Sequence, residues 1–163
     1  MLELKDGSYG ALQRLLYRIA VKRLMEAFDA ALDRAKIARR RLSEEAGMPP
    51  NAFTSTKNEM EDPRLSTFLR YYCAAVRLLS SMGAEEISVD SMIRDSAAAK
   101  IIDLADEIAL AGAGALSDED SMRLFASLKQ DVLLLTKKGA VSEEELAAFS
   151  AVCSMIQGGC GKQ

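Results

Sequence analysis

Apolar residues recur at helical spacing along the first part of the chain. Between residues 9 and 35 most of them fall three or four positions apart, with charged residues between them. This spacing gathers apolar side chains on one face of a helix. It predicts one long helix, or two joined end to end. The apolar positions are Leu12, Leu15 or Leu16, Ile19, Leu24, Phe28, Ala31, Leu32 and Ala35.

The apolar pattern over residues 37–58 predicts shorter helices. Ile37 and Leu42 predict about two turns of helix. Gly47 follows, where glycine can adopt the left-handed conformation that ends a helix. The two prolines after it lack amide donors, which the first turn of a helix does not need. We therefore expect a second short helix there, with Phe53 against the core.

A longer helix is expected next, running to about Met82. Asp62 is a suitable N-cap, and Pro63 suits the first helical position. A short polar segment, SSMGAEEISVD, is the best candidate for a connection between domains. The buried face of the helix is expected to contain Leu65, Phe68, Leu69, Tyr72, Val76 and Leu79.

Three further helices are expected after this connection. The first spans about residues 89–110. The second opens at a capping box formed by Ser117 and Asp120 and closes at Gly139. The third opens at the sequence SEEE. The pattern predicts an all-α protein: a helix-turn-helix domain with an N-terminal helical extension in residues 1–83, then a small three-helix domain in residues 84–163.

Composition agrees with a globular helical protein. The chain has 163 residues, of which 49% are hydrophobic and 28% charged, and only 3 are proline. No apolar run approaches the roughly 20 residues of a membrane span, and the first residues lack a basic-then-apolar signal pattern. We expect a cytoplasmic protein with no membrane partner.

Charge divides unevenly between the two expected domains. Residues 1–83 contain 14 Lys and Arg against 10 Asp and Glu, whereas residues 84–163 contain 7 against 14. The first segment therefore carries +4 and the second −7. A basic segment joined to an acidic one favours a polyanionic partner for the first. The acidic segment is expected to mediate self-association or to bind a protein partner.

Candidate chemistry is sparse. The chain has no histidine, and Cys73, Cys153 and Cys160 are too far apart for a disulfide framework or a zinc site. We expect Cys73 and Cys153 to be small apolar core residues. No acid, lysine or serine is paired in a catalytic spacing, so we expect no enzyme, no catalytic or metal site and no cofactor.

The turn at Gly47 is part of a longer pattern. An apolar residue precedes the first short helix, a leucine lies inside it, and an Ala-Gly turn is followed by an apolar residue. In this respect the segment resembles the Cro/C1-type (XRE-like) helix-turn-helix family of phage and bacterial repressors, over about residues 24–80. The matching positions, in register without gaps, are Ile37, Leu42, Ala46, Gly47, Met48, Phe53, Pro63, Leu65 and Phe68.

The resemblance implies a DNA-binding domain whose third helix lies in the major groove while the second crosses the backbone. Arg39 takes the position of a phosphate contact at the start of the second helix, beside Arg40. The same match implies two further sets of residues. One set would lie near base edges, and the other would contact phosphates from the end of the third helix and the loop after it. The first set is Pro50, Asn51, Thr54 and Ser55, and the second is Lys57, Asn58 and Arg64.

Three positions depart from the family pattern. The family favours an apolar residue at Thr56, glutamate at Lys57 and glycine at Glu59. The recognition face also lacks Gln and Arg, although Arg is the commonest specific reader of guanine. Two hypotheses therefore stay open. One is a DNA-binding transcriptional regulator that acts as a homodimer. A mobile element is one source from which such a regulator can come. The other is a helix-turn-helix-like adaptor or inhibitor that binds protein and no specific DNA.

Overall fold

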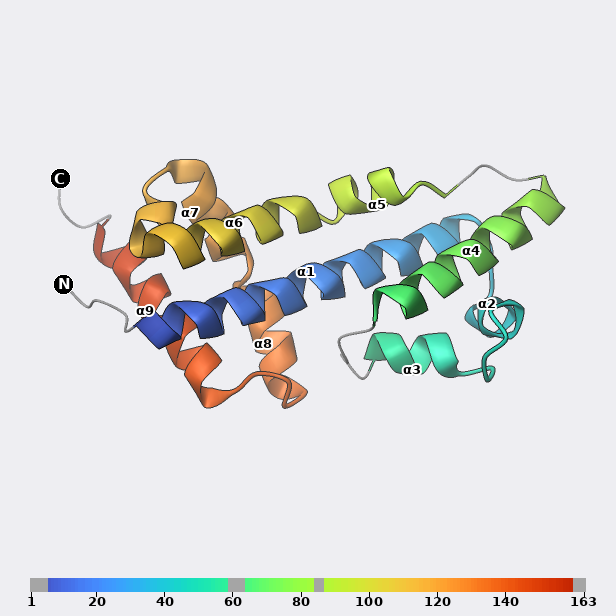
Figure 1. Ribbon diagram of the computed structural model, residues 1–163, viewed down its shortest axis with the longest axis horizontal. Coiled ribbons are helices and arrows are strands. Elements are labelled where there is room, and N and C mark those ends of the chain that lie inside the picture. Colours follow the sequence, from blue (N-terminus) through green and yellow to red (C-terminus); the bar gives the residue numbers. More distant parts are fainter. Residues whose placement is uncertain (1–5, 59–63, 84–86, 160–163) are drawn as a thin grey trace. The chain divides into compact units, whose positions relative to one another are not determined.

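The computed structural model describes residues 6–58, 64–83 and 87–159 (Figure 1). These residues form nine α-helices and one short 3-10 helix, with no β-strand among them. The all-α fold predicted from the sequence is confirmed. The elements are α1 (Asp6–Arg34), α2 (Arg39–Glu45), α3 (Ala52–Asn58), α4 (Leu65–Met82), α5 (Val89–Asp95), α6 (Ala98–Ala111), η1 (Gly112–Leu116), α7 (Glu119–Ser127), α8 (Lys129–Lys137) and α9 (Glu143–Gly159).

The helices group into two compact units. The central unit is Val21–Ala98, and the flanking unit combines Met1–Ala20 with Ala99–Gln163. Helix α1 therefore contributes its first part to the flanking unit and its second part to the central unit. This grouping differs from a division at residue 83, because α5 lies with the central unit and the first residues of α1 lie with the C-terminal helices.

An aromatic cluster forms the centre of the central unit. The ring of Phe53 on α3 lies 5.6 Å from that of Phe28 on α1 and 5.1 Å from that of Tyr71 on α4. Phe28 also contacts Phe68 at 5.7 Å. Edge-on aromatic pairs at these distances add to the stabilisation from burial. The expected burial of Phe53 is confirmed, and it holds α3 against α1 and α4.

The buried face of α4 contains Phe68 and Leu79 as expected but differs from the predicted face at other positions. Tyr71 is fully buried, whereas Leu65 is 72% and Leu69 45% exposed. Tyr72 is half-buried, and its hydroxyl donates to the carbonyl oxygen of Ile87 at 3.1 Å. The prediction was wrong because two overlapping sets of positions both have helical spacing. Ala74 and Ala75 also belong to the buried face. Alanine is only weakly hydrophobic, so these two positions did not indicate which face is buried.

Two other expectations concern the burial of cysteines and the start of α4. Cys73 is exposed and Cys153 half-buried, so the predicted burial of Cys73 was wrong. Helix α4 begins at Leu65, with Arg64 in the cap position. The expected cap at Asp62 and the proline at 63 lie outside the described residues.

Two of the three helices expected after residue 88 are interrupted. Ala97 takes the left-handed conformation with φ 56°, which separates α5 from α6. The hydroxyl of Ser96 accepts the amide of Ala98 at 3.3 Å and so caps the second of these helices. Leu128 separates α7 from α8, and its amide turns back to the carbonyl of Phe125 at 3.1 Å. Apolar periodicity continues across both breaks, which is why it did not reveal them.

The caps of α7 and α9 show how local hydrogen bonds set these starts. Helix α7 is capped by Asp118, whose carboxylate accepts the amide of Ser121 at 3.0 Å, and not by Ser117 as expected. At α9 the amide of Glu145 donates to the hydroxyl of Ser142 at 3.1 Å, and the Ser142 amide donates back to the Glu145 carboxylate at 3.3 Å. This reciprocal capping box fixes the start predicted at SEEE.

Polar contacts join the first part of α1 to the C-terminal helices of the flanking unit. Arg18 donates to the carbonyl of Ala140 at 2.6 Å and to the carboxylate of Glu145 at 3.1 Å. Gln13 donates to Asp106 on α6 at 3.2 Å. These partners are more than 90 residues away in the chain. No described helix has the length and apolar character that a membrane crossing needs.

Candidate functional site

Helices α2 and α3 form a pair joined by a tight turn. They pack against each other, and α2 also packs against α4. Gly47 has φ 72°, and its amide donates to the Glu44 carbonyl at 3.0 Å. The amide of Met48 donates to the backbone carbonyl of Ser43 at 2.9 Å. This pair of bonds is a Schellman motif, which favours glycine at the left-handed position. The predicted role of Gly47 in ending the first short helix is confirmed.

Ser43 was not singled out from the sequence. It is fully buried. Its hydroxyl accepts the amide of Phe53 at 3.1 Å and donates to the carbonyl of Arg39 at 3.1 Å. One side chain thus satisfies the first turn of α3 from within α2. A serine beside charged residues in a short helix resembles a solvent-facing one, so little in the sequence pointed to this contact.

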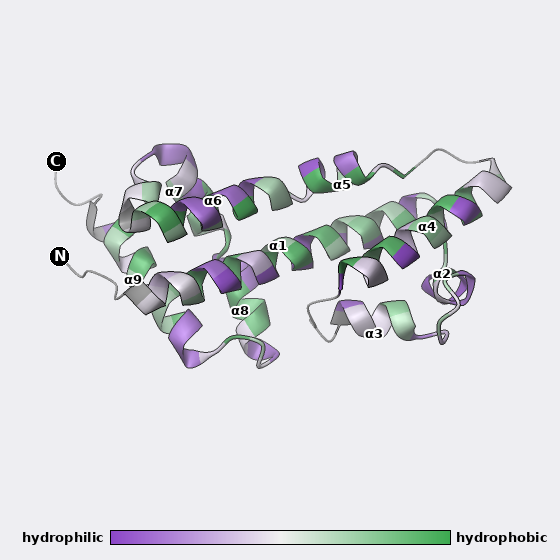
Figure 2. Ribbon diagram, viewed as in Figure 1, coloured by the Kyte–Doolittle hydropathy of each residue, from purple (hydrophilic) through white to green (hydrophobic). Residues whose placement is uncertain are grey.

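The residues predicted to lie near bases are on the outer side of α3 and in the turn before it. Pro50, Asn51 and Thr54 are exposed, and Ser55 is half-buried. Phe53, between them in sequence, points into the core. Helix α3 therefore has an apolar side that anchors it and a polar side that faces outward. Figure 2 shows the hydrophilic residues of α2 beside this helix.

Two of the residues predicted to contact phosphates form ion pairs within the protein. The Nε of Arg39 lies 2.8 Å from Oδ1 of Asp29, and the Nζ of Lys57 lies 2.6 Å from Oδ2 of the same carboxylate. Arg39 also binds Asp33, at 2.6 Å. A single carboxylate on α1 thus joins α2 and α3. No sequence signal paired these residues, because they lie 10 and 28 positions apart.

This network favours the charged forms of Asp29 and Arg39. Burial disfavours the charged form of Asp29, but the hydrogen bonds and positive charge of Arg39 and Lys57 outweigh it, so the pKa of Asp29 lies below its ordinary 3.8. The carboxylates of Asp29 and Asp33 raise the pKa of Arg39. Asp29 and Arg39 are therefore both charged near neutral pH.

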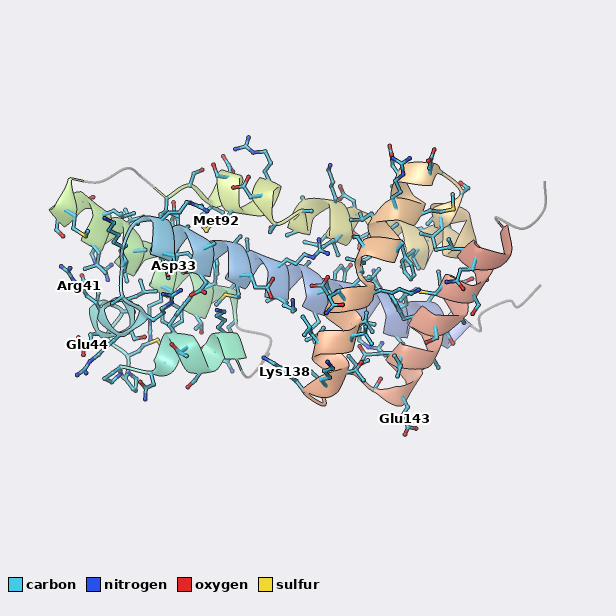
Figure 3. The ribbon with its side chains drawn as sticks, turned by 180° about the vertical axis from the view of Figure 1, so that it is seen from behind. Asp33, Arg41, Glu44, Met92, Lys138 and Glu143 are labelled. Atoms are coloured by element: carbon cyan, nitrogen blue, oxygen red, sulfur yellow. The ribbon has the colours of Figure 1, made fainter. Side chains whose placement is uncertain are left out.

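The other cations of the site differ in how they are held. Arg40 forms an exposed ion pair with Glu44 at 3.0 Å, and a pair of this kind contributes little to stability. Arg41 and Arg64 are exposed and form no ion pair among the described residues. Figure 3 labels Arg41 and Glu44 on α2 and Asp33 on α1. Asn58 ends α3, but its side chain is outside the described part.

Two of the three departures from the family pattern have a structural counterpart. Thr56 is half-buried, and its hydroxyl donates to the Ala52 carbonyl at 2.9 Å, so a polar residue fits at this place. Lys57 binds Asp29, a contact that a glutamate would replace with repulsion. Glu59 lies outside the described residues.

Charge in the central unit is balanced. Val21–Ala98 contains 12 Lys and Arg against 12 Asp and Glu, so its formal charge is zero. The +4 of residues 1–83 does not carry over to this compact unit. The unit includes four acids and one arginine between residues 84 and 98, and it excludes residues 1–20, which carry a net positive charge. Any attraction for a polyanion must therefore come from local charge and not from the unit as a whole.

The described residues hold no group of three or more His, Cys, Asp and Glu side chains suited to a metal ion. The chain matches no protein-family model, no curated protein and no solved structure. The helix-turn-helix resemblance thus rests on the residues from 24 to 80 and stays a prediction. The geometry that bears on function is the α2–α3 pair: a buried anchor at Phe53, an outward polar face, and cations at its edge.

Proposed function

We propose that the protein is a DNA-binding transcriptional regulator of the helix-turn-helix type, which contacts double-stranded DNA with the outer face of α3. The observation that carries this proposal is the division of α3 into a buried side at Phe53 and a polar side at Asn51 and Thr54. A helix held firmly on one side and polar on the other fits the major groove.

The side chains of this face have suitable chemistry. The amide of Asn51 can bond adenine at two positions, and the hydroxyls of Thr54 and Ser55 can contact several bases. Arg41 and Arg64 are exposed and available for phosphates, which would set the register of the helix on the duplex. Arg40 would add a third contact after leaving Glu44.

Selection from a pool of random duplexes tests the proposal. The full-length protein is expected to enrich one sequence motif, and its affinity for that motif is expected to fall steeply with salt. Asn51→Ala with Thr54→Ala should reduce discrimination against random DNA by about 1 to 3 kcal/mol for each side chain that bonds a base well. Ser80→Ala, an exposed change on α4, is the matched control. The proposal fails when no motif is enriched and duplex binding is absent.

A second candidate is a protein-binding adaptor or inhibitor that uses the same module without specific DNA. The zero charge of the central unit favours it, as do the exposed Leu65 and Leu69 on α4. This function predicts that Asn51→Ala and Thr54→Ala leave all nucleic-acid binding unchanged, while changes at the two leucines abolish capture of a protein partner.

We also propose that the protein is a homodimer, since one short recognition helix reads few bases and a second copy doubles the site. The helices after residue 83 offer apolar surface for it. On α6, Ile102 is 41% and Leu110 89% exposed, and on α8 Leu133 is 55% exposed. Sedimentation at micromolar concentration should give twice the 17.7 kDa chain mass. Leu110→Ser together with Leu133→Ser should give the single-chain mass with unchanged helicity.

A further inference from the structure

Asp29 occupies an unusual place in the candidate site. Its side chain is only 12% exposed, and both of its carboxylate oxygens bind cations: Oδ1 binds Arg39 at 2.8 Å and Oδ2 binds Lys57 at 2.6 Å. These are two of the residues at which a phosphate contact is expected. The carboxylate therefore binds the same two cations that are expected to contact phosphate.

Both cations retain the means to bind an anion. A guanidinium has five N–H donors and an ammonium three. Arg39 uses one donor for Asp29 and another for Asp33, and Lys57 uses one. The two side chains are 33% and 32% exposed. An approaching phosphate could thus reach either cation without unfolding of the module.

The charge of the group is nevertheless cancelled. Arg39 and Lys57 carry two positive charges, and Asp29 and Asp33 carry two negative charges within 2.8 Å of them. The salt dependence of polyanion binding measures how many phosphates a protein neutralises. A cation already neutralised by a carboxylate adds little to that number until the carboxylate is displaced.

We infer that Asp29 is an internal counterion that limits polyanion binding at the α2–α3 pair, by competing with phosphate for Arg39 and Lys57. The naming of DNA as the polyanion rests on the proposed function, but the competition itself does not. Loss of the Asp29 charge should free Lys57 and leave Arg39 held by Asp33 alone, whereas loss of the more exposed Asp33 should release only one of the two bonds of Arg39.

The experiment compares Asp29→Asn with Asp103→Asn in the full-length protein. Asp103 is exposed on α6 in the flanking unit, so its variant makes the same change in net charge away from the site. On a sulfated-polysaccharide column, Asp29→Asn should elute at higher salt than Asp103→Asn. With random duplex DNA, its log-log salt slope should be steeper by about 1, because one freed cation releases about 0.9 counterion.

The two readouts separate the inference from the proposed function. Equal elution of the two variants from the polysaccharide overturns the inference, whatever happens with DNA. Failure of all variants to bind duplex DNA overturns the proposed function and leaves the polysaccharide result to decide the inference. Circular dichroism checks folding. If Asp29→Asn is unfolded, Asp33→Asn replaces it, and elution of this variant together with Asp103→Asn overturns the inference.

Discussion

The central and flanking units each contain a buried carboxylate that binds an arginine, but the two carboxylates have different surroundings. Glu145 in the flanking unit binds Arg18 and also caps its own helix through Ser142. Asp29 in the central unit binds cations from two other helices with both of its oxygens. The first carboxylate closes a helix end, whereas the second controls the charge of an outward face. A buried ion pair therefore indicates a function only when the surface next to its cation is also considered.

The largest expected effect compares the aromatic anchors of the two units. Phe53→Ala and Phe125→Ala should each cost about 3 to 5 kcal/mol, because both rings are fully buried. Urea unfolding followed by circular dichroism measures the loss. Leu65→Ala, at a side chain 72% exposed, should stay within about 0.5 kcal/mol of wild type. An unchanged unfolding midpoint for Phe53→Ala would contradict the packing of α3 against α1 and α4.

Ser43→Ala comes next in size. The change leaves the buried amide of Phe53 without its acceptor, which should cost about 1 to 3 kcal/mol. Ser80→Ala, at an exposed serine of α4, should change stability by less than about 0.5 kcal/mol. The same urea titration compares them. Equal stability of the two variants would show that the hydroxyl of Ser43 does not hold the start of α3.

The adjacent tyrosines of α4 should respond with opposite signs. The buried Tyr71 hydroxyl has no hydrogen-bond partner among the described residues, so Tyr71→Phe should raise stability by up to about 1 kcal/mol. Tyr72 donates to Ile87, so Tyr72→Phe should lower it by about 1 kcal/mol. Thermal unfolding of both variants tests this, and a loss at position 71 that exceeds the loss at 72 would reject the assigned face.

The smallest effect is a dependence on pH. The pKa of Asp29 is lowered in the folded state, so its stabilising contribution is present above the unfolded value near 3.8 and is lost as pH falls through the lower folded value. Hydrogen bonds from Ser121 similarly lower the pKa of Asp118 in the flanking unit. In Asp29→Asn, the stability of α2 and α3 should therefore fall less steeply as the pH is lowered. Amide hydrogen exchange measures this local stability. Asp118→Asn should have the same effect on α7 alone, and a reversed assignment would contradict the network.

The sequence predicted the fold class and the α2–α3 turn because both depend on local signals. Glycine at position 47 and the apolar residues Leu42 and Phe53 act over a few positions. The face of α4 was mispredicted because Tyr71 and Tyr72 are adjacent and chemically alike, and only the neighbouring helices choose between them. The breaks at Ala97 and Leu128 lie inside continuous apolar patterns, so periodicity did not reveal them.

The charge of the candidate site was less predictable still. Arg39 and Lys57 were expected at phosphates from their places in the pattern, and both side chains bind Asp29. That carboxylate lies on a different helix, and its pairing depends on how α1, α2 and α3 pack. Summing charge along the chain also assigned +4 to a segment whose compact counterpart is neutral. Local patterns thus located the α2–α3 pair but not the state of its cations.

The central claim is that the outer face of α3 binds DNA, and a nuclear magnetic resonance titration tests it most directly. Duplex DNA carrying the selected motif is added to the isotope-labelled full-length protein, and backbone amide shifts are followed in both units. The largest changes are expected at Asn51, Thr54 and Ser55 and at the arginines of α2, with little change in α7 and α9. Shifts confined to α7 and α9, or none at saturating DNA, would contradict the claim.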